Sequence, residues 1–176
     1  MKRTEKYNTV LGFATMAHSG QKRKYSDNDY IIHPIAVAEL VTKKGGDTNQ
    51  VLAALLHDVV EDTPFTGTDI YNMLLDKGFN IEDAEDVSKL VNELTDVYTK
   101  ENYPALNRAK RKSREAERLG SCSARGQFIK ACDMIDNSIS IVDGDPAFAK
   151  VYLREKELIA RKLNKIPRSL FRELVI

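Results

Sequence analysis

Apolar side chains recur every three or four residues along most of the chain, the spacing that places them on one face of an α-helix. The first stretch with this pattern covers residues 4–19 and ends at Gly20. Residues 20–30 are polar and predict a loop. Pro34 is then expected to open the second helix, because proline is favoured at a first helical position, and Gly45 marks its end.

The third helix is predicted over residues 48–60, with Asp47 as its N-cap. Its segment VLAALLHDVV is apolar on most faces, which indicates a buried helix. Further helices are predicted over residues 67–77, 81–98, 104–119, 124–142, 146–164 and 167–174. No stretch alternates convincingly with the period of two that a strand requires. The pattern therefore predicts an all-α protein, a compact helical bundle with residues 1–176 in a single domain.

Composition and charge exclude several classes of protein. The chain is 42% hydrophobic and 30% charged, with a formal net charge of +1, so it is not expected to bind nucleic acid non-specifically. No apolar run reaches the roughly 18 residues that a membrane span needs, and the N-terminus has no apolar signal core. Cys122 and Cys132 lack a CxxC spacing and predict free thiols. We therefore expect a cytoplasmic protein with neither nucleic acid nor a membrane as partner.

Only three histidines, His18, His33 and His57, are available for metal chemistry. His57 and Asp58 adjoin at the end of an apolar helix, where a charged group is costly unless something compensates it. His33 stands at a predicted helix start, and Asp133 lies within the apolar run FIKACDMI. Two imidazoles and two carboxylates suit a divalent ion such as Mn²⁺, Fe²⁺, Zn²⁺ or Mg²⁺. Each residue alone is more often a packing residue, but their order in an all-α chain resembles the signature of the HD phosphohydrolase superfamily.

The residues after Asp58 extend this motif to HDVVED. Helical spacing of four places Glu61 near His57 and Asp62 near Asp58. One acid could orient or deprotonate water and the other could protonate a leaving oxygen, which is what phosphoryl hydrolysis needs. The alternative is that both acids merely cap the turn before Pro64.

Longer segments of the sequence resemble the hydrolase domain of RelA/SpoT proteins and, at this chain length, the small alarmone hydrolases. The resemblance covers most of residues 7–160 and rests on FATMAHSGQKRK, YIIHPIAVAEL, VLAALLHDVVEDT, LVNELTD, the RK pair at 111–112 and FIKACDMIDN. It implies one Mn²⁺ held by His33, His57, Asp58 and Asp133, with Glu61 and Asp62 as catalytic residues. It also implies removal of the 3′-pyrophosphate from guanosine tetra- or pentaphosphate, leaving GDP or GTP and pyrophosphate.

The same resemblance implies residues that bind the nucleotide substrate. Arg23 and Lys24 match a nucleotide-binding pair, since a guanidinium can stack on a purine and a lysine can meet phosphate. Without the resemblance these two residues would be a solvated basic loop. Thr95 matches a base contact, and Asn137 matches a ribose or phosphate contact one helical turn after the aspartate ligand. Arg108 falls near a position that carries a phosphate-binding lysine in relatives.

Other segments depart from the family pattern and leave alternatives open. The loop SDNDY at 26–30 replaces the family's Gly-Glu-Pro-Tyr wording, and the region from 97 to 125 diverges. The chain could therefore be an HD phosphohydrolase that acts on a deoxynucleotide, a nucleotide phosphate or NADPH. It could also be an inactive nucleotide-binding protein, although the intact Glu61 and Asp62 argue against this. The basic segment 100–118 is either a solvated helix or a rim that attracts an anionic nucleotide. His18 is expected to make hydrogen bonds that either support a metal ligand or anchor the loop.

Overall fold

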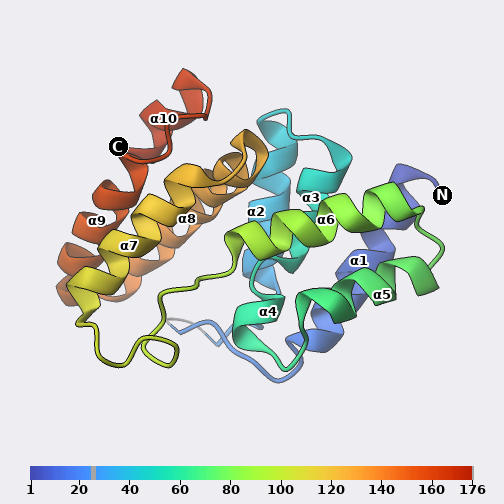
Figure 1. Cartoon of the computed structure of the whole chain (residues 1–176), viewed down its shortest axis with the longest axis horizontal. Coiled ribbons are helices and arrows are strands. Elements are labelled where there is room, and N and C mark those ends of the chain that lie inside the picture. Colours follow the sequence, from blue (N-terminus) through green and yellow to red (C-terminus); the bar gives the residue numbers. More distant parts are fainter. Residues whose placement is uncertain (25–26, 176) are drawn as a thin grey trace. The chain divides into compact units, whose positions relative to one another are not determined.

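Figure 1 shows a computed structural model of the chain, which describes residues 1–24 and 27–175. The predicted loop and its departure from the family wording fall partly on Tyr25 and Ser26, which lie outside the described residues. Regular structure in the described residues is helical apart from one isolated bridge between Lys22 and Asp29, which confirms the all-α class. The chain divides into two compact units, Met1–Thr95 and Asp96–Ile176, and each is described by itself. The single domain expected from the sequence stays a prediction.

The first unit is organised around a central buried helix, α3. Its helices are α1 (Arg3–Ala17), α2 (Ile32–Lys43), α3 (Thr48–Leu56), α4 (Val59–Asp62), α5 (Gly67–Asp76) and α6 (Ile81–Leu94). Helix α3 packs against α1, α2 and α6, and α5 packs on α6 (Figure 1). Every residue of α3 from Gln50 to Leu56 is buried, as its apolar sequence predicted. Asp47 caps this helix as predicted, because its side chain accepts a hydrogen bond from the Gln50 N–H at 2.9 Å.

Two helix boundaries near the HD motif differ from the prediction. Helix α2 begins at Ile32 and not at Pro34, so His33 lies within its first turn. The proline is tolerated there because the first N–H groups of a helix have no acceptor within it. The helix predicted over 48–60 is interrupted: α3 ends at Leu56, the next two residues form a turn, and α4 begins at Val59. The apolar pattern continues through this turn, which is why periodicity did not reveal it.

The second unit contains α7 (Arg108–Ser121), α8 (Ala124–Gly144), α9 (Pro146–Ala160) and α10 (Arg168–Leu174). Helix α9 packs against α7 and α8, and α10 packs against α8 (Figure 1). The predicted helix over 104–119 starts later, at Arg108, where the Asn107 side chain caps it by accepting a hydrogen bond from the Lys110 N–H at 2.9 Å. The helix predicted over 81–98 ends earlier, at Leu94. Neither Cys122 nor Cys132 forms a disulfide, as predicted.

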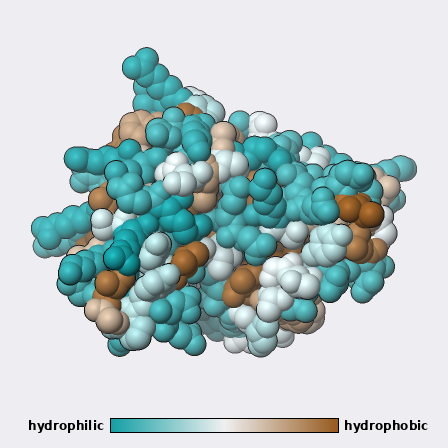
Figure 2. Space-filling model, viewed as in Figure 1, coloured by the Kyte–Doolittle hydropathy of each residue, from teal (hydrophilic) through white to brown (hydrophobic). Residues whose placement is uncertain are grey.

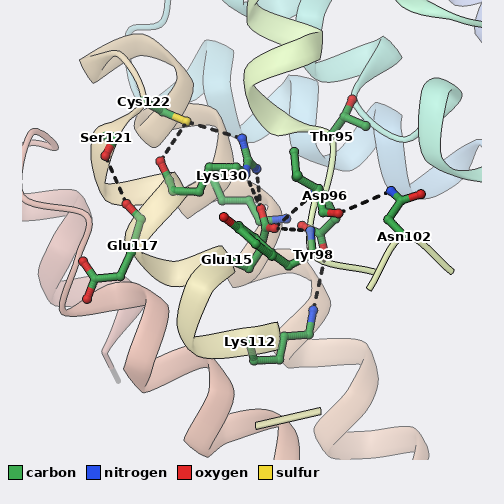
Figure 3. A network of polar contacts seen from close by, with 12 residues as sticks. Thr95, Asp96, Tyr98, Asn102, Lys112, Glu115, Glu117, Ser121, Cys122 and Lys130 are labelled. Carbon is green, nitrogen blue, oxygen red and sulfur yellow. Dashed lines mark hydrogen bonds and ion pairs between the residues drawn. The ribbon is translucent and has the colours of Figure 1, made fainter. Parts of the chain in front are cut away.

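A buried carboxylate binds the irregular backbone that follows α6, at residues 97–98. Glu115 of α7 is 1% exposed. One of its oxygens accepts hydrogen bonds from the backbone N–H groups of Val97 and Tyr98, at 3.1 and 2.9 Å (Figure 3). Its other oxygen accepts from Nε of Arg118 at 2.5 Å. These bonds compensate the buried charge and hold the backbone of 97–98 in an irregular conformation.

The surface is mainly polar. Figure 2 shows that hydrophilic residues cover most of the face in view, with apolar residues scattered between them. Within residues 1–24 and 27–175, no helix has the length and apolar character needed to cross a membrane.

Candidate metal centre and its surroundings

Three side chains of the first unit converge where the HD motif predicted. Nε2 of His33 lies 3.6 Å from Oδ2 of Asp58, and Nε2 of His57 lies 3.1 Å from the same oxygen. The two imidazole rings meet edge to face, with centroids 5.1 Å apart. Ligand atoms of all three residues lie within 4.8 Å of one another. Both histidines are buried, whereas the Asp58 side chain is 16% exposed, so the cluster has a buried base and reaches solvent through the carboxylate.

A hydrogen bond behind the His57 ring decides which nitrogen faces Asp58. Nδ1 of His57 lies 2.8 Å from the carbonyl oxygen of Ala54. Because a carbonyl only accepts, Nδ1 carries a proton, and Nε2 is the nitrogen that faces the carboxylate and offers a lone pair when the ring is neutral. With a neutral ring, two acceptors at this distance repel each other, and a cation bound between them removes that repulsion. Metal-ligating histidines are typically held by this kind of bond to a carbonyl, so the residues fit a divalent cation.

Tyr30 contacts the cluster, although the sequence analysis did not single it out. Its hydroxyl donates a hydrogen bond to Oδ2 of Asp58 at 2.7 Å. Burial raises the pKa of Tyr30, and the nearby carboxylates of Asp58 and Asp62 raise it further, so the hydroxyl stays protonated and remains a donor. The available signal was its position in the phrase YIIHP, three residues before His33.

His18 and Gln21 connect the end of α1 to the end of α4. His18 is buried, and its Nδ1 lies 2.8 Å from Oε1 of Gln21, which confirms the expected loop-anchoring bond. The amide nitrogen of Gln21 donates to the backbone carbonyl oxygen of Asp62 at 2.7 Å. The His18 ring also lies 4.9 Å from the ring of Tyr30, centroid to centroid. Gln21 was visible in the sequence only as part of the QKRK loop motif.

The two acids of HDVVED follow the metal cluster on α4. The Asp62 N–H donates to the carbonyl oxygen of Asp58 at 2.9 Å, so the helical spacing predicted for this pair is confirmed despite the break in the helix. Asp62 is exposed, but partial loss of hydration of its carboxyl group, together with the negative charge of Asp58, raises the pKa of Asp62, against opposing contributions from Tyr30 and nearby histidines. Glu61 is exposed at the same helix end. Catalytic roles for Glu61 and Asp62 stay predictions.

The QKRK loop brings one basic residue next to the cluster. The guanidinium of Arg23 lies over the ring of Tyr30, 5.9 Å from its centroid. The Arg23 N–H donates to the carbonyl oxygen of Asn28 at 3.0 Å, which closes the loop on itself. Lys24 is exposed. A nucleotide-binding role for Arg23 and Lys24 stays a prediction.

The fourth predicted ligand, Asp133, belongs to the second unit. It is buried on α8, 2.9 Å from Nζ of Lys130, and accepts a hydrogen bond from Nδ2 of Asn137 at 2.6 Å. The prediction that Asp133 and Asn137 share one helix face is thus confirmed. The place of Asp133 in the metal centre stays a prediction.

The other two predicted nucleotide contacts have partners within the protein. Thr95 follows the last residue of α6, and its hydroxyl donates to the carbonyl oxygen of Val91 at 3.0 Å. Arg108 makes a two-pronged ion pair with Glu155, with N···O distances of 2.6 and 2.8 Å. Both residues would need to rearrange or use remaining hydrogen-bonding capacity to bind a nucleotide.

Much of the basic segment 100–118 is paired within the second unit. Lys112 lies 3.3 Å from a carboxylate oxygen of Asp96, and Arg118 pairs with Glu115 (Figure 3). The guanidinium of Arg114 lies 5.8 Å from the centroid of the Tyr98 ring. These contacts favour a mainly structural role for several of the charges and reduce the positive charge available to a substrate.

Comparison with known proteins places the cluster in a family. Residues 11–136 match the HD domain family. The chain belongs to the HD domain family. The three converging residues, His33, His57 and Asp58, lie within the range that matches this family.

Several curated relatives carry names that state an activity. MESH1 of Xenopus tropicalis and of Homo sapiens, each named a guanosine-3′,5′-bis(diphosphate) 3′-pyrophosphohydrolase, are both 34% identical to this chain, over 131 and 128 residues. These alignments cover 73% and 71% of this chain and 65% and 63% of the relatives. The bifunctional (p)ppGpp synthase/hydrolase SpoT of Escherichia coli is 47% identical over 75 residues, which are 42% of this chain and 10% of SpoT.

Two solved structures share the fold. One is described as a metazoan ortholog of SpoT that hydrolyses ppGpp; it has a TM-score of 0.79 and 26% identity, and the match covers 96% of this chain and 91% of that one. The other, lmo0812 from Listeria monocytogenes, has a TM-score of 0.64 and 22% identity, covering 86% of this chain and 96% of that one.

Proposed function

We propose that this HD-domain protein is a metal-dependent phosphohydrolase that removes the 3′-pyrophosphate of guanosine tetra- or pentaphosphate. The products are GDP or GTP and pyrophosphate. The observation that carries the proposal is the convergence of His33, His57 and Asp58, with the two acids of HDVVED on the following turn. The activity named for the MESH1 relatives supports the choice of substrate.

We assign the metal to His33, His57 and Asp58, with Asp133 as the fourth ligand and Mn²⁺ as the ion. When bound, a divalent ion polarises a phosphoryl oxygen and makes water a stronger nucleophile at neutral pH. The protein contributes two imidazole lone pairs and a negative carboxylate. The bond from His57 to the Ala54 carbonyl keeps that imidazole in the tautomer the ion requires.

The two acids divide the proton transfers of the reaction. Water attacks the phosphorus attached to the 3′ oxygen, and the bond between that phosphorus and the 3′ oxygen breaks. Glu61 orients the water and accepts its proton. Asp62 delivers a proton to the departing 3′ oxygen, a role that the desolvation of its carboxyl group favours because desolvation raises the pKa.

Arg23 is the best-supported nucleotide contact, because it lies over the ring of Tyr30 beside the metal cluster. Lys24, on the same loop, would contribute a second positive charge. Thr95, Asn137 and Arg108 complete the proposed binding set. The partner is a free nucleotide, and neither nucleic acid nor a membrane is required.

A second candidate is hydrolysis of another nucleotide by the same metal and acids. The observation that favours it is the internal pairing of Thr95 with Val91 and of Arg108 with Glu155, because two expected alarmone contacts are occupied.

A substrate panel separates the two candidates. Metal-stripped protein is incubated with guanosine tetraphosphate, the four deoxynucleoside triphosphates and NADPH, each with and without added Mn²⁺. We expect Mn²⁺-dependent formation of GDP and pyrophosphate, with the highest kcat/KM for guanosine tetraphosphate. Turnover of only a deoxynucleotide or NADPH would retain the site and change the substrate. If the protein binds Mn²⁺ but hydrolyses none of these compounds, the result would favour an inactive nucleotide-binding protein.

A further inference from the structure

Two residues outside the predicted catalytic and binding sets contact the segment from Asp58 to Asp62. Tyr30 bonds to the side chain at its start, and Gln21 bonds to the backbone at its end. Both come from the loop that joins α1 to α2, and the Tyr30 N–H donates to the carbonyl oxygen of Gln21 at 3.0 Å. The two contacts are therefore parts of one connected arrangement.

The Tyr30 hydroxyl bonds to the oxygen of Asp58 that faces the histidines. That oxygen, Oδ2, lies 2.7 Å from the tyrosine hydroxyl and 3.1 Å from Nε2 of His57. A carboxylate oxygen has two lone pairs, so one can accept the phenolic proton while the other faces a cation. The tyrosine ring is held in place beside His18 and His33, with centroids 4.9 and 6.0 Å away. Tyr30 thus fixes the rotation of the Asp58 carboxylate.

Gln21 stabilises the C-terminal end of a helix that is too short to be stable on its own. Helix α4 has four residues, and the carbonyl of its last residue, Asp62, has no acceptor role within the helix. The Gln21 amide nitrogen donates to that carbonyl at 2.7 Å. Its amide oxygen faces Nδ1 of His18, so the histidine fixes which end of the amide points at α4. Gly20, with a φ of 81°, provides the tight turn that places Gln21 there.

We propose that Tyr30 and Gln21 are positioning residues with separable tasks. Tyr30 orients the carboxylate of Asp58 toward the cation. Gln21, held by His18, fixes the end of α4 so that Glu61 and Asp62 reach the substrate. This inference rests on the proposed metal-dependent hydrolysis, and it predicts that loss of one residue changes metal affinity whereas loss of the other changes turnover.

The first test measures Mn²⁺ affinity without any substrate. Metal-stripped wild type, Tyr30→Phe and the control Tyr71→Phe are titrated with Mn²⁺ in a calorimeter. Tyr71 lies on α5 of the same unit, so the control also loses a tyrosine hydroxyl, but one outside the cluster. We expect the Kd of Tyr30→Phe to rise about 10-fold, the lower end of what loss of a group that orients a ligand produces. The control should match wild type.

The outcomes of this test are distinguishable. A Kd of Tyr30→Phe within twofold of wild type would overturn the positioning role of Tyr30 and leave the proposed function intact. Wild-type protein that binds no Mn²⁺ would overturn the proposed function, and the inference with it. Thermal unfolding of each variant shows whether it is folded at the temperature of the titration, so that weaker Mn²⁺ binding cannot be due to unfolding.

The second test compares Gln21→Met with Gln50→Met, which removes an amide from the capping box of α3 in the same unit. kcat, KM and Mn²⁺ Kd are measured on the nucleotide that wild type hydrolyses fastest. For Gln21→Met we expect kcat to fall at least about 10-fold, with KM and Mn²⁺ Kd within about threefold of wild type, because the acids are displaced while the ligands are not. Gln50→Met should lower the unfolding midpoint and leave kcat unchanged. Equal kcat for Gln21→Met and wild type, or equal losses in the two variants, would overturn the role of Gln21.

Discussion

Nε2 of His57 lies 3.1 Å from Oδ2 of Asp58, although the two residues are neighbours in the chain. In a continuous helix, adjacent side chains diverge by about 100°, as the 3.6-residue turn requires. Here α3 ends at Leu56 and α4 begins at Val59, so the pair lies in the turn between two helices. The two neighbours thus present their potential ligand atoms together at the junction of α3 and α4.

Asp58 is expected to be indispensable for metal binding. Asp58→Ala removes the only carboxylate of the three-residue cluster, so the metal content after loading with Mn²⁺ and the hydrolytic activity should both fall to background. Metal analysis of the desalted protein and a pyrophosphate-release assay check this. Asp76→Ala, an exposed aspartate at the end of α5, is the matched control and should retain both. Full activity in Asp58→Ala would remove the metal assignment.

Glu61→Gln should separate metal binding from turnover. The amide keeps the shape of the side chain but cannot accept a proton from water, so we expect normal Mn²⁺ content and a kcat lower by about 10²–10⁴-fold. Steady-state kinetics with metal analysis of the same sample make the comparison. An unchanged kcat would reduce Glu61 to a residue of the turn before Pro64.

Arg23→Ala should weaken binding more than chemistry. The guanidinium lies over Tyr30 and not within the metal cluster, so its loss should raise KM more than it lowers kcat. Lys22→Ala provides the control, because Lys22 is the preceding loop residue and pairs with the exposed Asp29. If Arg23→Ala changed kcat alone, the residue would not be a ground-state contact.

The raised pKa of Asp62 predicts a pH-dependent stability effect in metal-free protein. A carboxyl group whose folded pKa exceeds its unfolded pKa favours folding while protonated, and this contribution is lost as the pH rises through the folded value. Asp62→Asn mimics the neutral form. It should therefore raise the unfolding midpoint at pH 8. The gain should shrink toward pH 4.

Asp69 offers a control of opposite sign. Hydrogen bonds from the Thr66 hydroxyl and N–H lower the pKa of Asp69, so its charged form favours folding above the unfolded pKa. Asp69→Asn should lower the unfolding midpoint at pH 8, with a smaller effect in acid. Thermal scans of both variants at pH 4 and pH 8 test the pair. A shift of the same sign for the two substitutions would contradict the assigned electrostatics.

The sequence predicted the helices and the metal cluster because both depend on local signals. Spacing of three and four residues located α3, and residue type marked His57 and Asp58. Tyr30 and Gln21 were not assigned roles, because their bonds join the loop after α1 to the distant segment around α4. Gln21 and its partner Asp62, for example, are 41 residues apart in the chain. Polar contacts between distant segments do not appear in the hydrophobic periodicity of the sequence.

The irregular chain before α7 illustrates a second limit. Residues 95–98 continue the helical pattern of α6 and were predicted as helix. The buried carboxylate of Glu115 instead accepts the N–H groups of Val97 and Tyr98. A tertiary hydrogen bond thus replaces the local helical bonds, and only the three-dimensional structure reveals it.

The position of bond cleavage tests the central claim most directly. Guanosine tetraphosphate is hydrolysed by Mn²⁺-loaded protein in water enriched in oxygen-18, and the products are separated and analysed by mass spectrometry. Attack of water on the phosphorus at the 3′ oxygen predicts one heavy oxygen in pyrophosphate and none in GDP, with no turnover when Mn²⁺ is omitted. Heavy oxygen in GDP, stepwise release of orthophosphate, or equal turnover without a metal would contradict the account.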